Sequence, residues 1–239
     1  MKTGIIVLGR DSDSEQCVSF TNDCAEYLRY EGRRNVYSAF YHGTPYAGDV
    51  MVTMHDQGVD TFVILPLAIS EGKHTVWLMP KSVNLPDNFG SWTMIDGKDV
   101  ATRFATALGS DERMSDALVK REGTPDDETA LLLVSRGSPH SSTSKTGEFY
   151  ADALRSAGWR AEYSSVNYGP EVEKKAKELM DEGYTRIRVI PLFVAFDGRS
   201  SESIRSTLDD LLVDVEYSAT ISDLPVFKEI LNSKIPDDW

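Results

Sequence analysis

Residues 58–67 read GVDTFVILPL, and residues 183–192 read GYTRIRVIPL. In both segments a glycine and polar residues lead into an apolar run that ends in Pro-Leu, and Pro66 and Pro191 lie 125 positions apart. A short apolar run between turn-forming residues predicts a strand that is buried on both faces, as in a parallel sheet. The sequence therefore predicts two equivalent buried strands, one in each half of the chain.

A second pair of segments matches at almost the same distance. Residues 4–12 read GIIVLGRDS, residues 130–138 read ALLLVSRGS, and Arg10 and Arg136 lie 126 positions apart. Two matched segments at nearly one offset indicate that the chain is internally duplicated.

The segments between the apolar runs have the spacing of amphipathic helices. In residues 171–182, for example, apolar side chains recur at Val172, Ala176, Leu179 and Met180. Strands that alternate with helices predict right-handed βαβ units and an α/β fold. We expect two lobes, each with a four-stranded, mostly parallel sheet flanked by helices.

A polar stretch separates the two halves. Residues 122–128 are rich in charge, and Gly123 and Pro125 interrupt regular structure there. This stretch predicts an N-terminal lobe of residues 1–122 and a C-terminal lobe of residues 123–239.

The composition narrows the function. A net charge of −13 argues against a nucleic-acid partner, because nucleic-acid-binding proteins neutralise phosphates with Lys and Arg. The apolar runs are far shorter than the roughly 18 residues of a membrane span, and residues 4–8 are too short for a signal peptide. We therefore expect no membrane partner and a cytoplasmic location.

Cys17 and Cys24 would lie about 10 Å apart on a helix, too far for a disulfide, and are expected to pack as small apolar side chains.

Three pairs of loops follow the predicted strands. In open parallel α/β sheets, ligands bind outside the carboxyl ends of the strands, so these loops predict the rim of a site. The pairs are residues 10–12 with 136–138, 42–44 with 167–169, and 70–74 with 195–200.

Two of the four histidines, His42 and His74, fall on this rim. Both are candidates for metal or proton chemistry, because imidazole binds transition metals and titrates near neutral pH. His140 is either a surface residue or a further rim residue. His55, late in a predicted helix, is interpreted as a solvated or capping residue, and Ser144 is a candidate N-cap of the helix after His140.

Positive side chains also occupy the rim of this acidic chain. The four are Arg10, Lys73, Arg136 and Arg199. The planar guanidinium group suits carboxylates and phosphates, so these residues predict an anionic ligand. The alternative is that they form ion pairs with neighbouring carboxylates, namely Asp11, Glu71 and Asp197.

These loops resemble those of a known family. Residues 66–74, PLAISEGKH, look like the P-L-F-L-x-x-G-x-H stretch of the class II chelatases, the CbiX/SirB-type sirohydrochlorin enzymes. The loops after the first strand of each half resemble that family's G-H-G-S signature, and Gly137 and Ser138 match its last two residues. The resemblance covers both halves, which suits a family with both single-unit and fused, duplicated members.

The resemblance implies a bilobal α/β enzyme of tetrapyrrole and cobalamin biosynthesis. Such an enzyme inserts cobalt, nickel or iron into sirohydrochlorin without ATP, so the divalent metal is a substrate and no tightly bound cofactor is expected. Histidines of the strand-1 and strand-3 loops hold the metal and accept the pyrrole protons. The strand-3 histidine corresponds to His74, whereas Arg10 and Arg136 stand in place of the strand-1 histidines and the second strand-3 histidine is missing near Ser200.

This departure changes the expected site. Arginine stays cationic and cannot ligate a metal, and it would repel a divalent ion about 5 Å away by roughly 6–7 kcal/mol at an effective dielectric constant near 20. We therefore expect His74 and His42 to serve as metal ligands and catalytic residues, with Glu71 orienting His74. The residues predicted to bind the macrocycle and its carboxylates are Arg10, Ser12, Lys73, Arg136, Ser138 and Arg199.

Two other functions fit the sequence, and the oligomeric state stays open. A relative that binds a tetrapyrrole or a metal without inserting it would account for the missing histidines, and turnover separates it from a chelatase. A phosphate-handling α/β enzyme would use residues 136–138 as an anion loop. The phosphate-binding patterns G-x-x-x-x-G-K-[ST] and G-x-G-x-x-G are absent, as is the G-x-S-x-G pattern of serine hydrolases.

Overall fold

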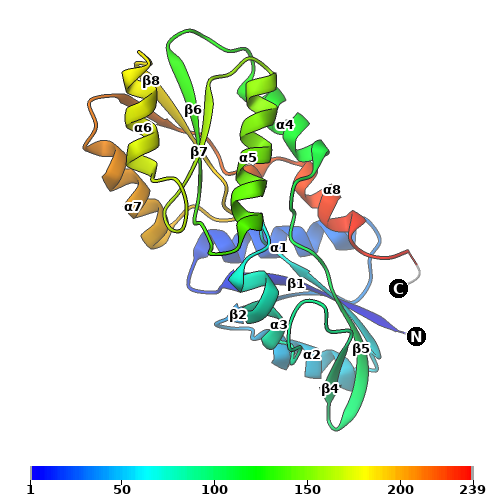
Figure 1. Cartoon of the computed structure of the whole chain (residues 1–239). Coiled ribbons are helices and arrows are strands. Elements are labelled where there is room, and N and C mark those ends of the chain that lie inside the picture. The colour runs from blue at the N-terminus through cyan, green and yellow to red at the C-terminus, as the bar shows by residue number, and fades with distance from the viewer. Residues whose placement is uncertain (1, 238–239) are drawn as a thin grey trace. The chain divides into compact units, whose positions relative to one another are not determined.

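A computed structural model describes residues 2–237 and divides the chain into two compact units (Figure 1). One unit holds the residues up to Leu108 together with those from Lys228 onward, and the other is Gly109–Phe227. Within the described residues, no helix is long and apolar enough to cross a membrane.

The first unit is built on a five-stranded sheet in the order β2-β1-β3-β5-β4. Four strands are parallel, and only β4 runs antiparallel to its neighbour β5. The strands are β1 (Thr3–Asp11), β2 (Val36–His42), β3 (Thr61–Pro66), β4 (Trp92–Ile95) and β5 (Lys98–Phe104). The helices up to β4 are α1 (Glu15–Tyr30), α2 (Ala47–Asp56), the π-helix η1 (His74–Leu78) and the short α3 (Met79–Lys81).

The prediction of four strands in the first lobe is wrong, because a hairpin adds a fifth. β4 and β5 pair from Ile95 opposite Lys98, across a turn formed by Asp96 and Gly97. Both turn residues have positive φ, 49° and 77°, which is the geometry of the tight hairpin turn that Asp-Gly favours. An Asp-Gly pair between short apolar runs is therefore the signal that the helix-based interpretation of this segment missed.

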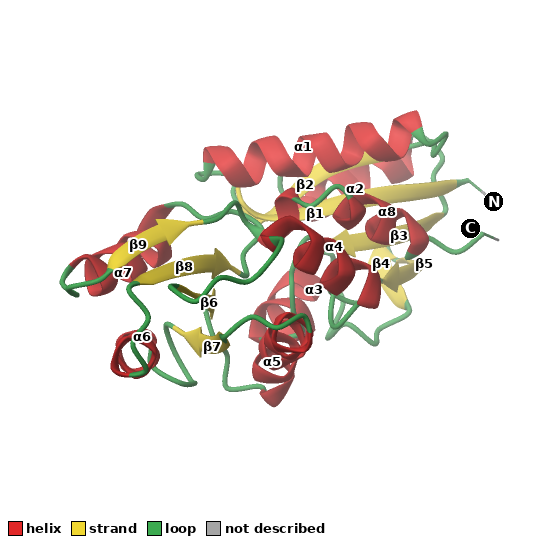
Figure 2. Cartoon of the chain, turned by 90° about the horizontal axis from the view of Figure 1, so that it is seen from above, coloured by secondary structure: helices red, strands yellow, loops and turns green. Residues whose placement is uncertain are grey.

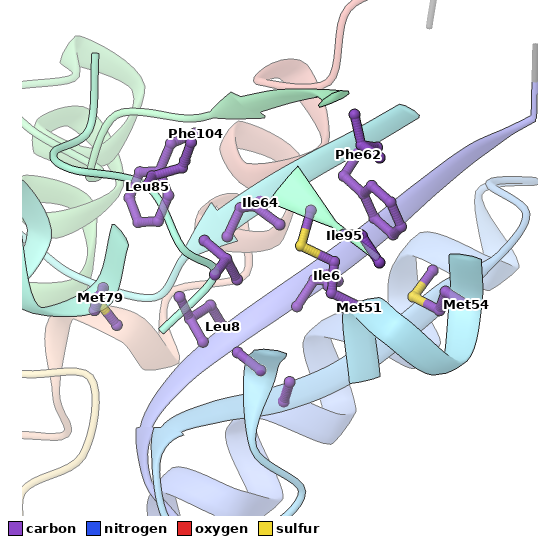
Figure 3. Packing of buried hydrophobic residues seen from close by; sticks show 14 of the residues in the cluster. Ile6, Leu8, Met51, Met54, Phe62, Ile64, Met79, Leu85, Ile95 and Phe104 are labelled. Atoms are coloured by element: carbon purple, nitrogen blue, oxygen red, sulfur yellow. The ribbon is translucent and has the colours of Figure 1, made fainter. Parts of the chain in front are cut away.

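Helices cover both faces of the first sheet (Figure 2). A Cβ on Gly9 would strike Thr21 of α1, so the odd-numbered residues of β1 face α1. The even-numbered Ile6 and Leu8 face the other way and share a buried cluster with Met51 of α2 (Figure 3). Because successive side chains of a strand point to opposite faces, this alternation fixes the face of every residue at the end of the strand.

The second unit carries the predicted four-stranded sheet, in the order β7-β6-β8-β9, and all of its strand pairs are parallel. Its strands are β6 (Thr129–Ser135), β7 (Ala161–Ser165), β8 (Arg186–Pro191) and β9 (Asp214–Tyr217). Its helices are α4 (Glu112–Glu122), α5 (Ser141–Ser156), α6 (Val172–Asp181), α7 (Gly198–Asp209) and the 3-10 turn η2 (Ile221–Asp223), and α8 (Val226–Ser233) follows across the unit boundary.

The two sheets repeat one pattern. In each, the first strand of the half lies between the second and the third, and the Pro that ends the third strand pairs in register with the first strand. Pro66 lies opposite Leu8, and Pro191 lies opposite Val134. The matched sequence segments thus occupy equivalent places in two α/β sheets, as expected for a duplicated chain.

The compact units divide the chain elsewhere than the lobes predicted from the polar stretch. The helix α4 belongs to the second unit, where Arg121 donates hydrogen bonds to the carbonyls of Ala219 and Thr220. Residues from Lys228 onward belong to the first unit, where the Lys234 ammonium group donates to the carbonyl of Ala107. Each compact unit therefore includes a helical segment from the other half of the sequence.

Candidate functional site at the carboxyl edge of the first sheet

The carboxyl ends of β1 and β2 place four of the rim side chains side by side. Gly9 pairs with Phe40, and Asp11 pairs with His42. Arg10 and Tyr41 lie between these pairs and are lateral neighbours. Because Gly9 faces α1, Asp11 and His42 leave the sheet on the α1 face, whereas Arg10 and Tyr41 leave it on the α2 face.

The loop after β3 carries His74 to the same edge. The backbone amide of Leu67 donates to the carbonyl of Leu8, which keeps the start of the loop on β1. Thr75 closes its other end, because its hydroxyl accepts from the amide of Gly72 and donates to the Gly72 carbonyl. His74 is the first residue of η1. The hydrogen bonds at both ends of the loop hold it in place.

The Tyr41 hydroxyl fixes the imidazole of His74. It lies 2.5 Å from Nδ1, and the two ring centroids are 5.8 Å apart. Both side chains are half-buried, and Tyr41 packs against the buried cluster of the α2 face. Tyr41 and His74 therefore form one group, which we call the α2-face group, and Arg10 leaves β1 on the same face of the sheet. Sequence reasoning missed Tyr41, although its place one residue before His42 in a strand already signals the opposite face.

His42 does not join this group. Its side chain is 71% exposed, and its Nδ1 lies 3.6 Å from the Asp11 carboxylate on the α1 face. Within residues 2–237, no three or more His, Cys, Asp or Glu side chains are grouped to hold a metal ion. The structure therefore places the two predicted metal ligands on opposite faces of the sheet.

Glu71 makes a backbone contact that the sequence did not predict. One oxygen of its carboxylate accepts a hydrogen bond of 2.8 Å from the amide of Ala107, beyond the end of β5. This contact ties the β3 loop to the neighbouring strand connection. The Tyr41 hydroxyl contacts Nδ1 of His74, and the orientation of His74 by Glu71 stays a prediction.

Ser12 and Lys73 lie at the same edge, in different roles. The hydroxyl of Ser12 accepts from the amide of Thr44, and a Cβ on Gly43 would fall 1.8 Å from that oxygen. Ser12 therefore joins the loops after β1 and β2. Lys73 is exposed immediately before His74, and Arg10 is exposed near the end of β1, so both present positive charge to solvent at this edge.

The equivalent edge of the second unit is built around Gly137. The carbonyl of Arg136 accepts from the backbone amide of Asn167, and Gly137 has a φ of 79°. A Cβ there would fall 1.5 Å from the Asn167 carbonyl oxygen, so only glycine lets the loops after β6 and β7 approach. The Ser138 hydroxyl accepts from the amide of His140, which makes it a loop-forming group.

Two aromatic rings and an arginine lie together near the ends of β8 and β9 in the second unit. The Arg205 guanidinium lies 4.1 Å from the ring centroid of Tyr217 and 5.5 Å from that of Phe196. Burial raises the pKa of Tyr217 above its ordinary value, and the charge of Asp209 adds to the rise. Arg199 is exposed in the first turn of α7.

The remaining histidines have local structural places. Nδ1 of His55, near the end of α2, lies 2.9 Å from the carbonyl of Val59, three residues beyond the helix, so its contact is local as the sequence led us to expect. His140 is the N-cap residue of α5, which begins at Ser141. The predicted N-cap at Ser144 is therefore wrong, because the helix starts one turn earlier.

Comparison with known proteins gives one family. The sequence model of the CbiX family matches residues 4–124 and 130–238. A sirohydrochlorin cobaltochelatase of Methanosarcina barkeri is 26% identical over 122 residues, which cover 50% of this chain and 94% of that protein. A second one, of Methanosarcina acetivorans, is 25% identical with the same coverage.

Solved structures show the same fold. SirB from Bacillus subtilis, solved with Fe³⁺, superposes with a TM-score of 0.75 at 18% identity, covering 98% of this chain and 94% of that one. The structure of a CbiX described as the terminal enzyme of sirohaem biosynthesis in denitrifying bacteria gives a TM-score of 0.65 at 17% identity, covering 98% and 97%. At this identity the likeness establishes the α/β architecture.

Proposed function

The chain belongs to the CbiX family, and from this premise we propose that it inserts a divalent metal into sirohydrochlorin or a related carboxylated tetrapyrrole without ATP. Cobalt, nickel and iron are the candidate metals, since imidazole suits all three. The observation that carries the proposal is the hydrogen bond between Tyr41 and His74 at the carboxyl edge of the first sheet.

His74 is the residue to which we assign the metal and the proton. The Tyr41 hydroxyl holds Nδ1, so Nε2, on the opposite side of the ring, is the atom that meets the macrocycle. A hydrogen bond at the far nitrogen of a metal-binding imidazole orients the ring and sets its tautomer. As the metal passes from Nε2 to the pyrrole nitrogens, two N–H protons leave, of which the released Nε2 accepts one and solvent the other.

Arg10 is assigned to the substrate and not to the metal. It lies beside Tyr41 on the α2 face, remains cationic, and repels a divalent ion. A guanidinium fork binds carboxylates well, and the macrocycle carries several. Lys73, exposed next to His74, adds charge of the same sign in a chain whose net charge of −13 otherwise repels an anion. Arg136 and Arg199 are proposed to do the same at the edge of the second sheet.

Ser12, Ser138 and Glu71 are assigned supporting roles. Each makes a hydrogen bond that shapes a rim loop, to the amides of Thr44, His140 and Ala107 respectively. His42, on the α1 face with Asp11, is not assigned to the metal, because it leaves the sheet on the other side from His74.

Anaerobic incubation with sirohydrochlorin and Co²⁺, Ni²⁺ or Fe²⁺ tests the proposal through the absorbance of the macrocycle. We expect the metal-free spectrum to disappear faster with the protein than without it.

A second function has its own support: arginine replaces histidine after the first strand of both halves, which suits a relative that binds the macrocycle without inserting metal. Tight binding without acceleration would identify that function.

Replacing Arg10 by Ala should weaken macrocycle binding, most strongly at low salt, where charges are least screened. Spectral titration with sirohydrochlorin at two ionic strengths measures this. Arg33→Ala is a matched control, because Arg33 lies just before the amino end of β2, at the other end of that strand from the candidate site, and donates a hydrogen bond to Asn232. Equal affinity of the Arg10 variant and the unmodified protein at both ionic strengths would remove the anion-binding role.

A further inference from the structure

The outer edge of the first sheet is an exposed apolar strand. β4 ends the strand order and pairs with β5 on one side only (Figure 1). Trp92 and Met94 are each 60% exposed, whereas Thr93 and Ile95 between and beside them are buried. Residues 90–95 carry no charge, although natural edge strands are commonly protected by Lys, Pro or a bulge.

The backbone of the same two residues points away from the sheet. Thr102 donates its amide to the carbonyl of Ser91, and Ile95 pairs with Lys98 across the hairpin turn. In an antiparallel pair, the residues that bond to the partner strand alternate with those that do not. The odd-numbered residues of this strand therefore bond to β5, and the N–H and C=O groups of Trp92 and Met94 face outward.

We propose that β4 is a dimerisation strand, which pairs antiparallel with β4 of a second copy of this chain. Of the antiparallel registers that bring the outward groups of two copies together, the one with Trp92 opposite Met94 lets both residues of each copy exchange hydrogen bonds, and we assign that register. Thr93 then lies opposite Thr93 on a two-fold axis. Each of the two Trp92–Met94 pairs supplies two N–H···O hydrogen bonds.

The side chains fit the same register. Directly opposite residues in an antiparallel pair have Cβ atoms about 4.5–5.5 Å apart on the same face of the sheet. Trp92 of each copy therefore meets Met94 of the other, and a thioether beside an indole ring is a favourable contact. Strand, register and side chains thus complement a second copy of themselves, which is why we assign a copy rather than an unrelated strand to this edge.

The mass in solution tests the proposal. Light scattering of the full chain after size-exclusion chromatography should give about twice the monomer mass of 26.6 kDa. Met94→Pro should give the mass of one chain: its N–H faces outward, so proline removes a contact of the dimer and leaves the β4–β5 ladder intact. Met94→Lys should do the same, and circular dichroism checks that both variants fold.

Leu212→Lys is the matched control, since Leu212 is a large apolar residue that is 98% exposed elsewhere on the surface. It should remain dimeric. A monomeric unmodified protein overturns the proposal, and so does a dimer that persists in both Met94 variants.

A disulfide tests the register itself. A mixture of Trp92→Cys and Met94→Cys chains should form a covalent dimer on mild oxidation, whereas neither variant alone should, because each new thiol would then face Met94 or Trp92. The native Cys17 and Cys24 are buried and do not interfere. Equal cross-linking of the separate variants and of the mixture would contradict the proposed pairing.

Discussion

Replacing His74 by Ala is expected to lower the rate of metal insertion by about 10²–10⁴-fold, the usual contribution of a positioned proton-transfer group. The fold should survive, because His74 is a half-buried residue at the start of η1 and not part of the buried cluster of the α2 face. The rate is measured from the macrocycle spectrum, with circular dichroism as the check on folding.

His55→Ala is the control for removing an imidazole, since His55 lies near the end of α2 and contacts the carbonyl of Val59. It should keep the full insertion rate. His42→Ala should keep more activity than His74→Ala, because His42 lies on the other face of the sheet. Full activity in the His74 variant would show that the catalytic assignment is wrong even though the family is right.

Tyr41→Phe keeps the imidazole of His74 but removes the hydroxyl that orients it. Loss of the hydroxyl should lower the insertion rate or the apparent metal affinity by about 10–100-fold, as is typical when the partner of a metal-binding imidazole is removed. Tyr37→Phe is a matched control on the same strand and face, since the Tyr37 hydroxyl contacts Gln57 instead. Equal effects of the two substitutions would contradict the positioning role of Tyr41.

Replacing Gly137 by Ala is expected to cost about 3–5 kcal/mol of unfolding free energy, the upper end of what single substitutions do. The new Cβ would fall 1.5 Å from the Asn167 carbonyl oxygen, and φ is 79°. Asn167 cannot easily retreat, because its amide donates to the Arg136 carbonyl and its own carbonyl accepts from Ser165. Urea unfolding followed by circular dichroism measures the change.

Gly183→Ala separates crowding from backbone strain. Gly183 has a φ of 101°, and no atom lies within 4 Å of its added Cβ. Only the strain of a positive φ remains there, about 1–3 kcal/mol. If Gly137→Ala were no more destabilising than Gly183→Ala, the close approach of the two loops would not be a constraint on the fold.

Much of the fold could be predicted because it follows from the spacing of apolar residues and from the internal duplication of the chain. The buried strands β3 and β8 are apolar runs bounded by turns, and their recurrence in the two halves indicated equivalent sheets. The β4–β5 hairpin has no helical periodicity, and its signal in the sequence is the turn-forming pair Asp96 and Gly97. The grouping of α4 with the second unit depends on tertiary contacts such as those of Arg121, which no local pattern encodes.

The sequence predicted the edge of the sheet at which the candidate site lies, but not which side chains meet there. The strand-end rule brought Arg10, His42 and His74 to one edge of the sheet. It did not say on which face each side chain lies, and that depends on the register of β1 with β2. Tyr41 was missed because an aromatic residue in a strand is usually part of the core, and its hydrogen bond to His74 depends on the tertiary fold.

Single-turnover insertion of Co²⁺ tests whether the protein is a chelatase that acts through His74. Protein and sirohydrochlorin are mixed anaerobically in equal amounts, Co²⁺ is added, and the macrocycle spectrum is followed over time beside a protein-free reaction. We expect the protein to accelerate insertion and His74→Ala to remove the acceleration while the macrocycle stays bound. A bound macrocycle that takes up Co²⁺ no faster than it does free in solution would contradict this expectation.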